Sequence, residues 1–186
     1  MSFIFGNISP KNYPIFWDGM KYYYSAGVNA SRLNTSRLTD FSQFFRGGTF
    51  QNAPEFSTQS MTRADNMFVS CSNMRTIPSP IDCSKCTIYN NMFSGCSNLR
   101  EVRFAGTING NLNMAYCSNL TSESIMSVCY CMASGGTLTL ASSLSSYATT
   151  YVKVVNGALI ISTSTDPEAV TLAQYMTDKG CILSFS

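Results

Sequence analysis

Eight cysteines are the residues of this chain with the most chemistry to offer, and two of them form the pair Cys83-x-x-Cys86. Zinc sites and dithiol redox centres both use this spacing. A zinc site needs a second pair, and Cys129-x-Cys131 has the wrong spacing for a standard zinc knuckle. We therefore predict that the chain binds no metal and no other cofactor, and keep a cytoplasmic thiol or zinc protein as an alternative.

Acid–base catalysis has few candidate residues in this sequence. The chain has no histidine, which removes the commonest general base. Glu101 and Arg103 are two residues apart, and on a strand they share one exposed face, which indicates a solvated pair or a ligand contact and not a catalytic dyad. Serine and threonine are abundant, but no base is placed to activate them. We predict that no residue is catalytic and that the protein is not an enzyme.

The charge balance argues against two classes of partner. Twelve basic and 10 acidic residues give a net charge of +2, which offers no electrostatic grip on nucleic acid or on anionic lipid. Charged residues make up only 12% of the chain, about half the usual share. We expect no nucleic-acid partner, and a surface covered mainly by serine, threonine and asparagine.

The first residues, Met1 to Ile8, have no basic region and too short an apolar run for a signal peptide. No segment approaches the roughly 18 apolar residues that a membrane helix needs, so we predict no membrane insertion. A chain that folds in a reducing cytoplasm keeps its cysteines as thiols, and we expect them to be buried. An even number of cysteines leaves a disulfide framework as the alternative.

One sequence motif in the middle of the chain occurs twice, at Asp65 to Met74 and at Asn90 to Leu99, 25 residues apart. A related copy runs from Thr35 to Phe45, and a degenerate one from Asn113 to Leu120. A fixed period of this size is typical of stacked repeats that are each too small to bury their own apolar face. We predict about four such units in residues 29–120.

Each unit has a simple physical interpretation. Leu99, Val102 and Phe104 point inward from a short strand, and the strands of successive units pair in parallel. The Met-Phe-x-x-Cys segment is expected to form the opposite wall as one helical turn. Two columns of buried side chains follow from the period: Cys71, Cys96 and Cys117, and Phe45, Phe68 and Phe93.

The strand face of the stack is the default binding surface, because the curvature of a solenoid makes one face concave. The predicted outward positions on it are Asn52, Pro54, Thr76, Pro78, Glu101 and Arg103. An ordinary solvated sheet is the alternative interpretation of the same residues.

Residues 1–28 do not match the repeat and are rich in aromatic side chains. Two short strands, Ile15 to Trp17 and Met20 to Tyr24, are expected around a turn at Asp18-Gly19. The segment is interpreted as a cap over the open end of the stack, which solenoids need. The alternative is a docking arm, because tryptophan and tyrosine are common interface anchors. The anchors would be Trp17, Tyr22, Tyr23 and Tyr24.

Residues 121–186 lose the repeat and are expected to form an α/β cap. A helix from Ser122 to Met132 with Thr121 or Ser122 as N-cap buries Ile125, Val128, Cys129 and Met132. Asn156-Gly157 predicts a hairpin between strands 151–155 and 158–162. The remaining expected elements are a strand at Thr137 to Leu140, a final helix capped by Asp166 with Pro167 at its first position, with Ala169, Leu172, Ala173 and Met176 facing inward and Gly180 after its end, and a closing strand at Cys181 to Phe185.

The repeat motifs resemble the leucine-rich repeats of bacterial surface proteins that are called BspA-like or Treponema-type. The resemblance rests on Thr35 to Phe45 and on the Asn-Met-Phe-x-x-Cys-Ser-Asn phrases at Asn66 to Asn73 and Asn91 to Asn98. The tail from Leu120 to Leu183 is similar to the ending of such proteins in gut bacteria and their phages. The resemblance implies a curved solenoid that binds a partner on a cell surface or on a phage particle.

Together these observations predict an α/β fold: a short leucine-rich-repeat solenoid with parallel strands, an aromatic N-terminal arm and an α/β C-terminal cap. The function expected is that of a phage virion component, a fibre, tail-tip or capsid accessory, made in the host cytoplasm. Its partners would be other virion subunits or a host-surface protein or glycan, and a homo-oligomer stays open. A bacterial cell-surface adhesion module is the alternative.

Overall fold

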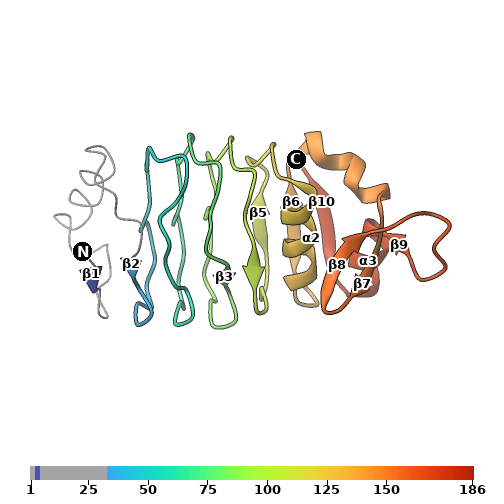
Figure 1. Cartoon of the computed structure of the whole chain (residues 1–186), viewed down its shortest axis with the longest axis horizontal. Helices are drawn as coiled ribbons and strands as arrows, with labels where there is room; N and C mark the ends of the chain where they lie inside the picture. The colour runs from blue at the N-terminus through green and yellow to red at the C-terminus, as the bar shows by residue number, and fades with distance from the viewer. Residues whose placement is uncertain (1–2, 5–32) are drawn as a thin grey trace.

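The computed structural model describes residues 3–4 and 33–186, and the fold is mixed α/β with small sheets and few helices. Apart from Phe3 and Ile4, the predicted arm lies outside the described residues, and so do Trp17, Tyr22, Tyr23, Tyr24 and the two strands around Asp18-Gly19. From β2 to β5, successive turns of the chain lie side by side along the long axis, and the C-terminal elements follow at one end (Figure 1).

The strands of the first part are short: β1 (Phe3–Ile4), β2 (Leu33–Asn34), β3 (Ile81–Asp82), β4 (Phe104–Ala105) and β5 (Leu112–Met114). The second part contains α2 (Ser122–Cys131), β6 (Thr137–Leu140), the 3₁₀ helix η2 (Ser142–Thr149), β7 (Tyr151–Val155), β8 (Ala158–Ile161), β9 (Val170–Thr171), α3 (Leu172–Asp178) and β10 (Ile182–Phe185).

Successive turns meet in two rows of parallel contacts. One row joins Asn52 to Thr76 and Thr76 to Glu101, and we call it the strand row. The other joins Asp40 to Arg63 and Arg63 to Ile88, and we call it the turn row. The strand pairs β1–β2, β3–β4, β5–β6 and β6–β10 are also parallel. The sheet β8–β7–β9 is antiparallel, so the predicted parallel order is only partial.

The predicted helical turn at Met-Phe-x-x-Cys is wrong. In a helix the N–H groups would donate to carbonyls of the same segment, but here alternate N–H groups donate to the carbonyls of the next turn at 2.7–2.9 Å. The positive φ of Asn66 (57°) and Ser70 (63°) interrupts the helical path. The donations run from Ala64 to Ile88, Asn66 to Asn90, Phe68 to Met92 and Ser70 to Ser94.

The two predicted core columns are confirmed. The rings of Phe45 and Phe68 stack at 5.2 Å, and those of Phe68 and Phe93 at 5.6 Å, with interplanar angles of 6° and 8°. Cys71, Cys96 and Cys117 are fully buried. All eight cysteines are free and buried, as expected for reduced thiols.

The thiols also join one turn to the next, which hydrophobicity alone does not predict. Cys71 Sγ donates to the carbonyl of Phe45 at 2.9 Å, and Cys96 Sγ donates to that of Phe68 at 3.1 Å. The asparagines two residues further on behave similarly: Asn98 Nδ2 donates to the carbonyl of Ser72 at 2.7 Å. The Cys-Ser-Asn phrase is therefore a turn whose side chains bond the preceding turn.

The elements predicted between Thr121 and Gly157 are confirmed. Thr121 caps α2 by accepting from the Ser124 N–H, and the predicted apolar stripe of the helix is buried. β6 spans the predicted residues, and β7 and β8 form the predicted hairpin. Asn156 and Gly157 have φ of 50° and 74°, the two positive values that a type I′ turn requires.

The final helix begins later than predicted. Asp166 does not cap it: Asp166 Oδ1 accepts from the Glu168 N–H at 3.1 Å in a separate turn, and Oδ2 binds Lys153 at 2.6 Å and the Ser162 hydroxyl at 2.7 Å. β9 pairs with β7 before α3 begins, and Thr171 is the N-cap. Leu172 and Met176 are buried as predicted, Ala173 is exposed, Ala169 is half-buried, and Gly180 has the expected positive φ of 75°. The competing pairing of β9 is the physical reason for the shift.

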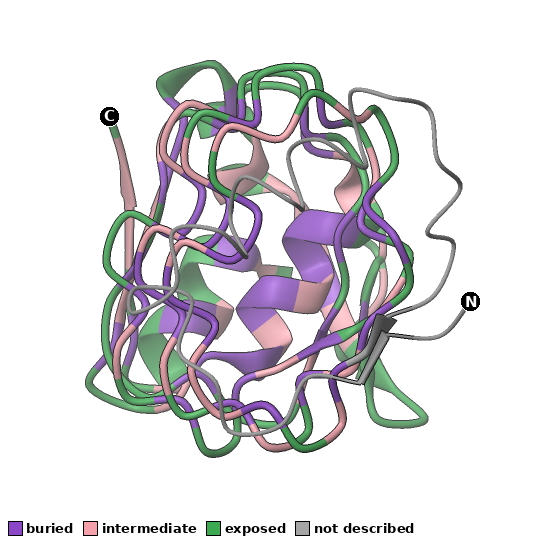
Figure 2. Cartoon of the chain, turned by 90° about the vertical axis from the view of Figure 1, so that its left-hand side faces the viewer, coloured by how far each residue is buried: buried purple, intermediate pink, exposed green. Residues whose placement is uncertain are grey.

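Helix α2 closes the strand row at its last turn. Seen end-on, the turns superimpose as a ring and α2 crosses behind it (Figure 2). Ser124 Oγ accepts from the Val102 N–H at 3.0 Å and donates to the Arg100 carbonyl at 3.0 Å. Ser127 Oγ accepts from the Phe104 N–H at 2.9 Å. Helix side chains thus satisfy backbone groups that would otherwise need another strand.

Replacing Ser124 by alanine is expected to destabilise the protein by about 1–3 kcal/mol, because the buried N–H of Val102 loses its acceptor and the Arg100 carbonyl keeps only its bond from the Thr121 N–H. Urea unfolding measures the change in the free energy of unfolding. Ser122→Ala is the matched control, since the Ser122 hydroxyl bonds only the exposed Glu123. Equal stability of the two variants would show that α2 does not close the row through Ser124.

Candidate functional site

The strand row borders a groove of about 500 Å³ at the N-terminal end of α2. Thr76, Pro78, Glu101 and Arg103 line it from the turns, and Glu123 lines it from the helix. We call it the strand-row groove. Four of the predicted strand-face residues therefore lie around one hollow.

Two predicted positions behave differently. Asn52 is exposed and lies beside Thr76 in the strand row, but it does not line the groove. Pro54 is buried, so its prediction as an outward residue is wrong. The next buried apolar residue, Phe56, is two positions after Pro54, whereas Ile81 is three positions after Pro78. The shorter connection draws Pro54 inward.

The groove carries charges of both signs. Glu101, Arg103 and Glu123 are all exposed. Hydrogen bonds from its own backbone N–H and from the Ser122 hydroxyl lower the pKa of Glu123, and Arg103 acts in the same direction. The sequence predicted Glu123 as a first-turn residue of the helix, but nothing in it placed α2 on the edge of the strand row. Two carboxylates and one guanidinium can bind a charged ligand without any proton transfer.

An apolar hollow of about 440 Å³ adjoins the groove and shares Arg103 and Glu123 with it. Its other walls include Met126 and Tyr130 of α2 and Ile161 of β8. Ile161 is 47% exposed and Ile160, which lines the same hollow, is 39% exposed, so the hollow has an exposed apolar patch. Together the groove and the hollow place charges beside exposed apolar surface, a combination that is typical of protein interfaces.

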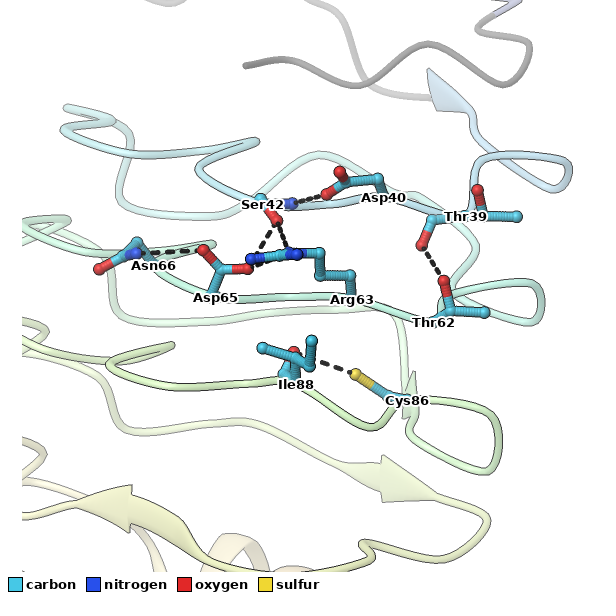
Figure 3. Close-up of polar contacts among 9 residues, drawn as sticks. All are labelled: Thr39, Asp40, Ser42, Thr62, Arg63, Asp65, Asn66, Cys86 and Ile88. Carbon is cyan, nitrogen blue, oxygen red and sulfur yellow. Dashed lines mark hydrogen bonds and ion pairs between the residues drawn. The ribbon is translucent and has the colours of Figure 1, made fainter.

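A half-buried polar cluster lies on the turn row, and no sequence motif predicted it (Figure 3). Arg63 Nε donates to Asp65 Oδ1 at 2.6 Å and to Ser42 Oγ at 3.1 Å, and Ser42 Oγ donates to Asp65 Oδ1 at 2.7 Å. The hydrogen bond to Asp65 raises the pKa of Arg63. The only signal was an aspartate in the slot where the next copy has Asn90. These hydrogen bonds join Ser42 of one turn to Arg63 and Asp65 of the next, so the cluster helps to fix the register of the two turns.

Cys83 and Cys86 are core residues. They are 2% and 0% exposed, and burial raises the pKa of both thiols, that of Cys86 to about 11. A thiol with so high a pKa is a poor nucleophile and a poor metal ligand at neutral pH. Within residues 3–4 and 33–186, no group of three or more His, Cys, Asp or Glu side chains is placed to hold a metal ion.

Over the described part of the chain, none of the helices has the length and apolar character to cross a bilayer. Comparison of the sequence and structure with protein-family models, with curated proteins and with solved structures found no match. The groove and the hollow must therefore be interpreted from their own geometry and chemistry.

Proposed function

We propose that this protein is a non-enzymatic binding protein that presents the strand-row groove to a partner. The observation that carries the proposal is the meeting of Thr76, Pro78, Glu101 and Arg103 around one hollow. These residues come from two different turns, and each was selected from the sequence for its outward position. A surface that repeated turns and a helix build together is suited to recognition.

The proposal includes a leucine-rich-repeat solenoid of the BspA-like kind. Parallel contacts between successive turns support it, as do the stacked rings of Phe45, Phe68 and Phe93. In such a stack each turn contacts only its neighbours, and the inward columns serve as scaffold.

The resemblance of the repeat motifs supports a phage virion component, a fibre, tail-tip or capsid accessory, as the setting. The partner of the groove is then another virion subunit or a host-surface protein or glycan. The apolar hollow beside the groove favours a protein, because exposed aliphatic and aromatic side chains beside an arginine are typical interface anchors. Trp17, Tyr22, Tyr23 and Tyr24 remain the proposed docking arm.

The double change Glu101→Gln with Arg103→Gln is expected to weaken binding at least about tenfold, because the guanidinium and one of the two carboxylates leave the groove. The measurement is the affinity of labelled protein for host-cell envelopes and for purified phage particles. Lys85→Gln with Glu168→Gln is the matched control, since both side chains are exposed and outside the groove.

Unchanged affinity of the groove variant, with the same melting temperature as the parent, would sink the proposal for the groove. The virion setting has a separate test. Mass spectrometry of particles made from the same genome should detect this chain, and its absence from every particle would contradict a virion role.

A further inference from the structure

A third hollow, of about 310 Å³, lies beside β5 and β6 and shares no residue with the strand-row groove. Four asparagines and two threonines line it, and we call it the asparagine pocket. They are Asn90, Asn91, Asn111, Asn113, Thr137 and Thr139. Tyr89 and Leu112 complete the lining and are buried. Its volume is at the lower end of the range for small-ligand sites.

The chemistry of the pocket is neutral and rich in hydrogen-bonding groups. None of the described residues that line it carries a charge at neutral pH. An amide offers both donors and an acceptor, and a threonine hydroxyl offers both functions on one atom. A ligand matched to this lining has many hydroxyl groups and no charge.

Two of the amides are held in a fixed orientation. Asn111 Oδ1 accepts from the Thr137 N–H at 2.9 Å, and Asn113 Oδ1 accepts from the Ala115 N–H at 2.9 Å. Each bond identifies the oxygen, so Nδ2 is the atom left over. Among the described residues, neither Nδ2 has a protein acceptor. The pocket thus contains two preorganised N–H donors.

At Asn113 the backbone needs only a side-chain oxygen, because Asp82 Oδ1 accepts from the Ser84 N–H in the same way. Asn91 has a φ of 55°, a conformation that asparagine tolerates, so the turn alone explains its presence. Asn113 lies in β5, where it pairs with Thr139 of β6, and asparagine is depleted in strands. Asn111 and Asn113 are both exposed and alternate with the buried Leu112 and Met114. Their Oδ1 atoms serve the backbone of Thr137 and Ala115, which leaves their Nδ2 groups for a ligand.

We propose that the asparagine pocket binds a neutral, hydroxyl-rich saccharide. The two Nδ2 groups donate to sugar hydroxyl oxygens, and the threonine hydroxyls accept or donate as the sugar requires. This site goes beyond the proposed binding at the strand-row groove, because it uses other residues and binds a saccharide, whereas the groove favours a protein. Both sites can act in one protein, and each can fail without the other.

The test is a glycan array with neutral and anionic saccharides, followed by titration calorimetry with the saccharide bound best. The key variant is Asn111→Asp with Asn113→Asp. Its carboxylates still accept from Thr137 and Ala115, but both N–H donors are gone and two charges are added. We expect binding of neutral saccharides by the parent and a loss of at least about tenfold in the variant. Asn73→Asp is the matched control, exposed and remote from the pocket.

Three results would overturn the inference: no neutral saccharide bound by the parent, binding restricted to anionic saccharides, or equal affinity of the folded double variant. Thr137→Val provides a second test if the double variant does not fold, because it removes one hydroxyl from the pocket and suits a strand. Equal affinity of that variant would also count against the site. The groove variant Glu101→Gln with Arg103→Gln should keep full saccharide affinity.

Discussion

Raising the pH from about 8 to about 11 is expected to unfold the protein, because its buried thiols cannot ionise in the folded state. Burial raises the pKa of Cys71, Cys117 and Cys129 to about 12 and that of Cys86 to about 11. In the unfolded chain a thiol has a pKa of about 8.5. The folded state therefore holds protons that the unfolded state releases, and stability falls as the pH rises above the unfolded value.

The size of this effect is comparable to the whole stability of a domain. Each such thiol lowers the free energy of unfolding by about 1.4 kcal/mol per pH unit between its unfolded and folded pKa values. Four thiols together lower the free energy of unfolding by roughly 5–6 kcal/mol for each pH unit, and the whole free energy of unfolding of a domain is typically about 5–15 kcal/mol. We expect the protein to unfold at about pH 10.

Circular dichroism and thiolate ultraviolet absorbance, recorded together against pH, measure this transition. Both signals should change in one step, because the thiols ionise only when the chain unfolds. Cys117→Ala should reduce the slope of stability against pH by about 1.4 kcal/mol per unit, since one suppressed thiol is gone. Thiolate absorbance that appears near about pH 9 with the fold intact would contradict the buried cysteine column.

The second large effect is expected for Phe68→Ala, which should destabilise the protein by about 3–5 kcal/mol. The ring of Phe68 is fully buried and stacks on Phe45 on one side and on Phe93 on the other. Its removal leaves a cavity between three turns, and the neighbouring rings cannot close it because their backbones are tied together by hydrogen bonds.

Urea unfolding gives the free-energy change for Phe68→Ala. Tyr116→Ala is the control, an aromatic truncation in the last copy of the repeat at a side chain that is 58% exposed, and it should stay within about 0.5 kcal/mol of the parent. A cost near that of the control would mean that neighbouring turns do not share one core.

The core columns could be predicted from the sequence because a fixed period repeats each buried slot. Cys71 and Cys96 occupy the same position in two nearly identical phrases, so one inference placed both. The hairpin was equally predictable, since Asn156-Gly157 suits only a few turn types. Local chemistry was sufficient in both cases.

The errors came where a neighbouring segment overrides local preference. The Met-Phe-x-x-Cys phrase has helical spacing, but the next turn accepts its N–H groups and no helix forms. The final helix starts at Leu172 because β9 pairs with β7 first. Sequence-local signals do not contain these pairings.

The candidate sites were predictable to different degrees. Strand alternation predicted Glu101 and Arg103 as residues of one exposed strand face. The position of Glu123 opposite them depends on how α2 covers the last turn, which no motif indicates. The asparagine pocket was not predicted, because asparagine is a common turn residue and so these asparagines did not indicate a binding site. Only the pairing of Asn113 with Thr139 joins them into one surface.

We propose that a partner contacts the strand-row groove while the repeat residues serve as scaffold. Carbodiimide labelling of carboxylates, read by mass spectrometry with and without bound host-cell envelopes or phage particles, tests it most directly. We expect labelling of Glu101 and Glu123 to fall on binding, while that of the exposed Glu168, outside the groove, stays constant. Full labelling of Glu101 and Glu123 in the bound protein, with protection of Glu168 instead, would contradict the account.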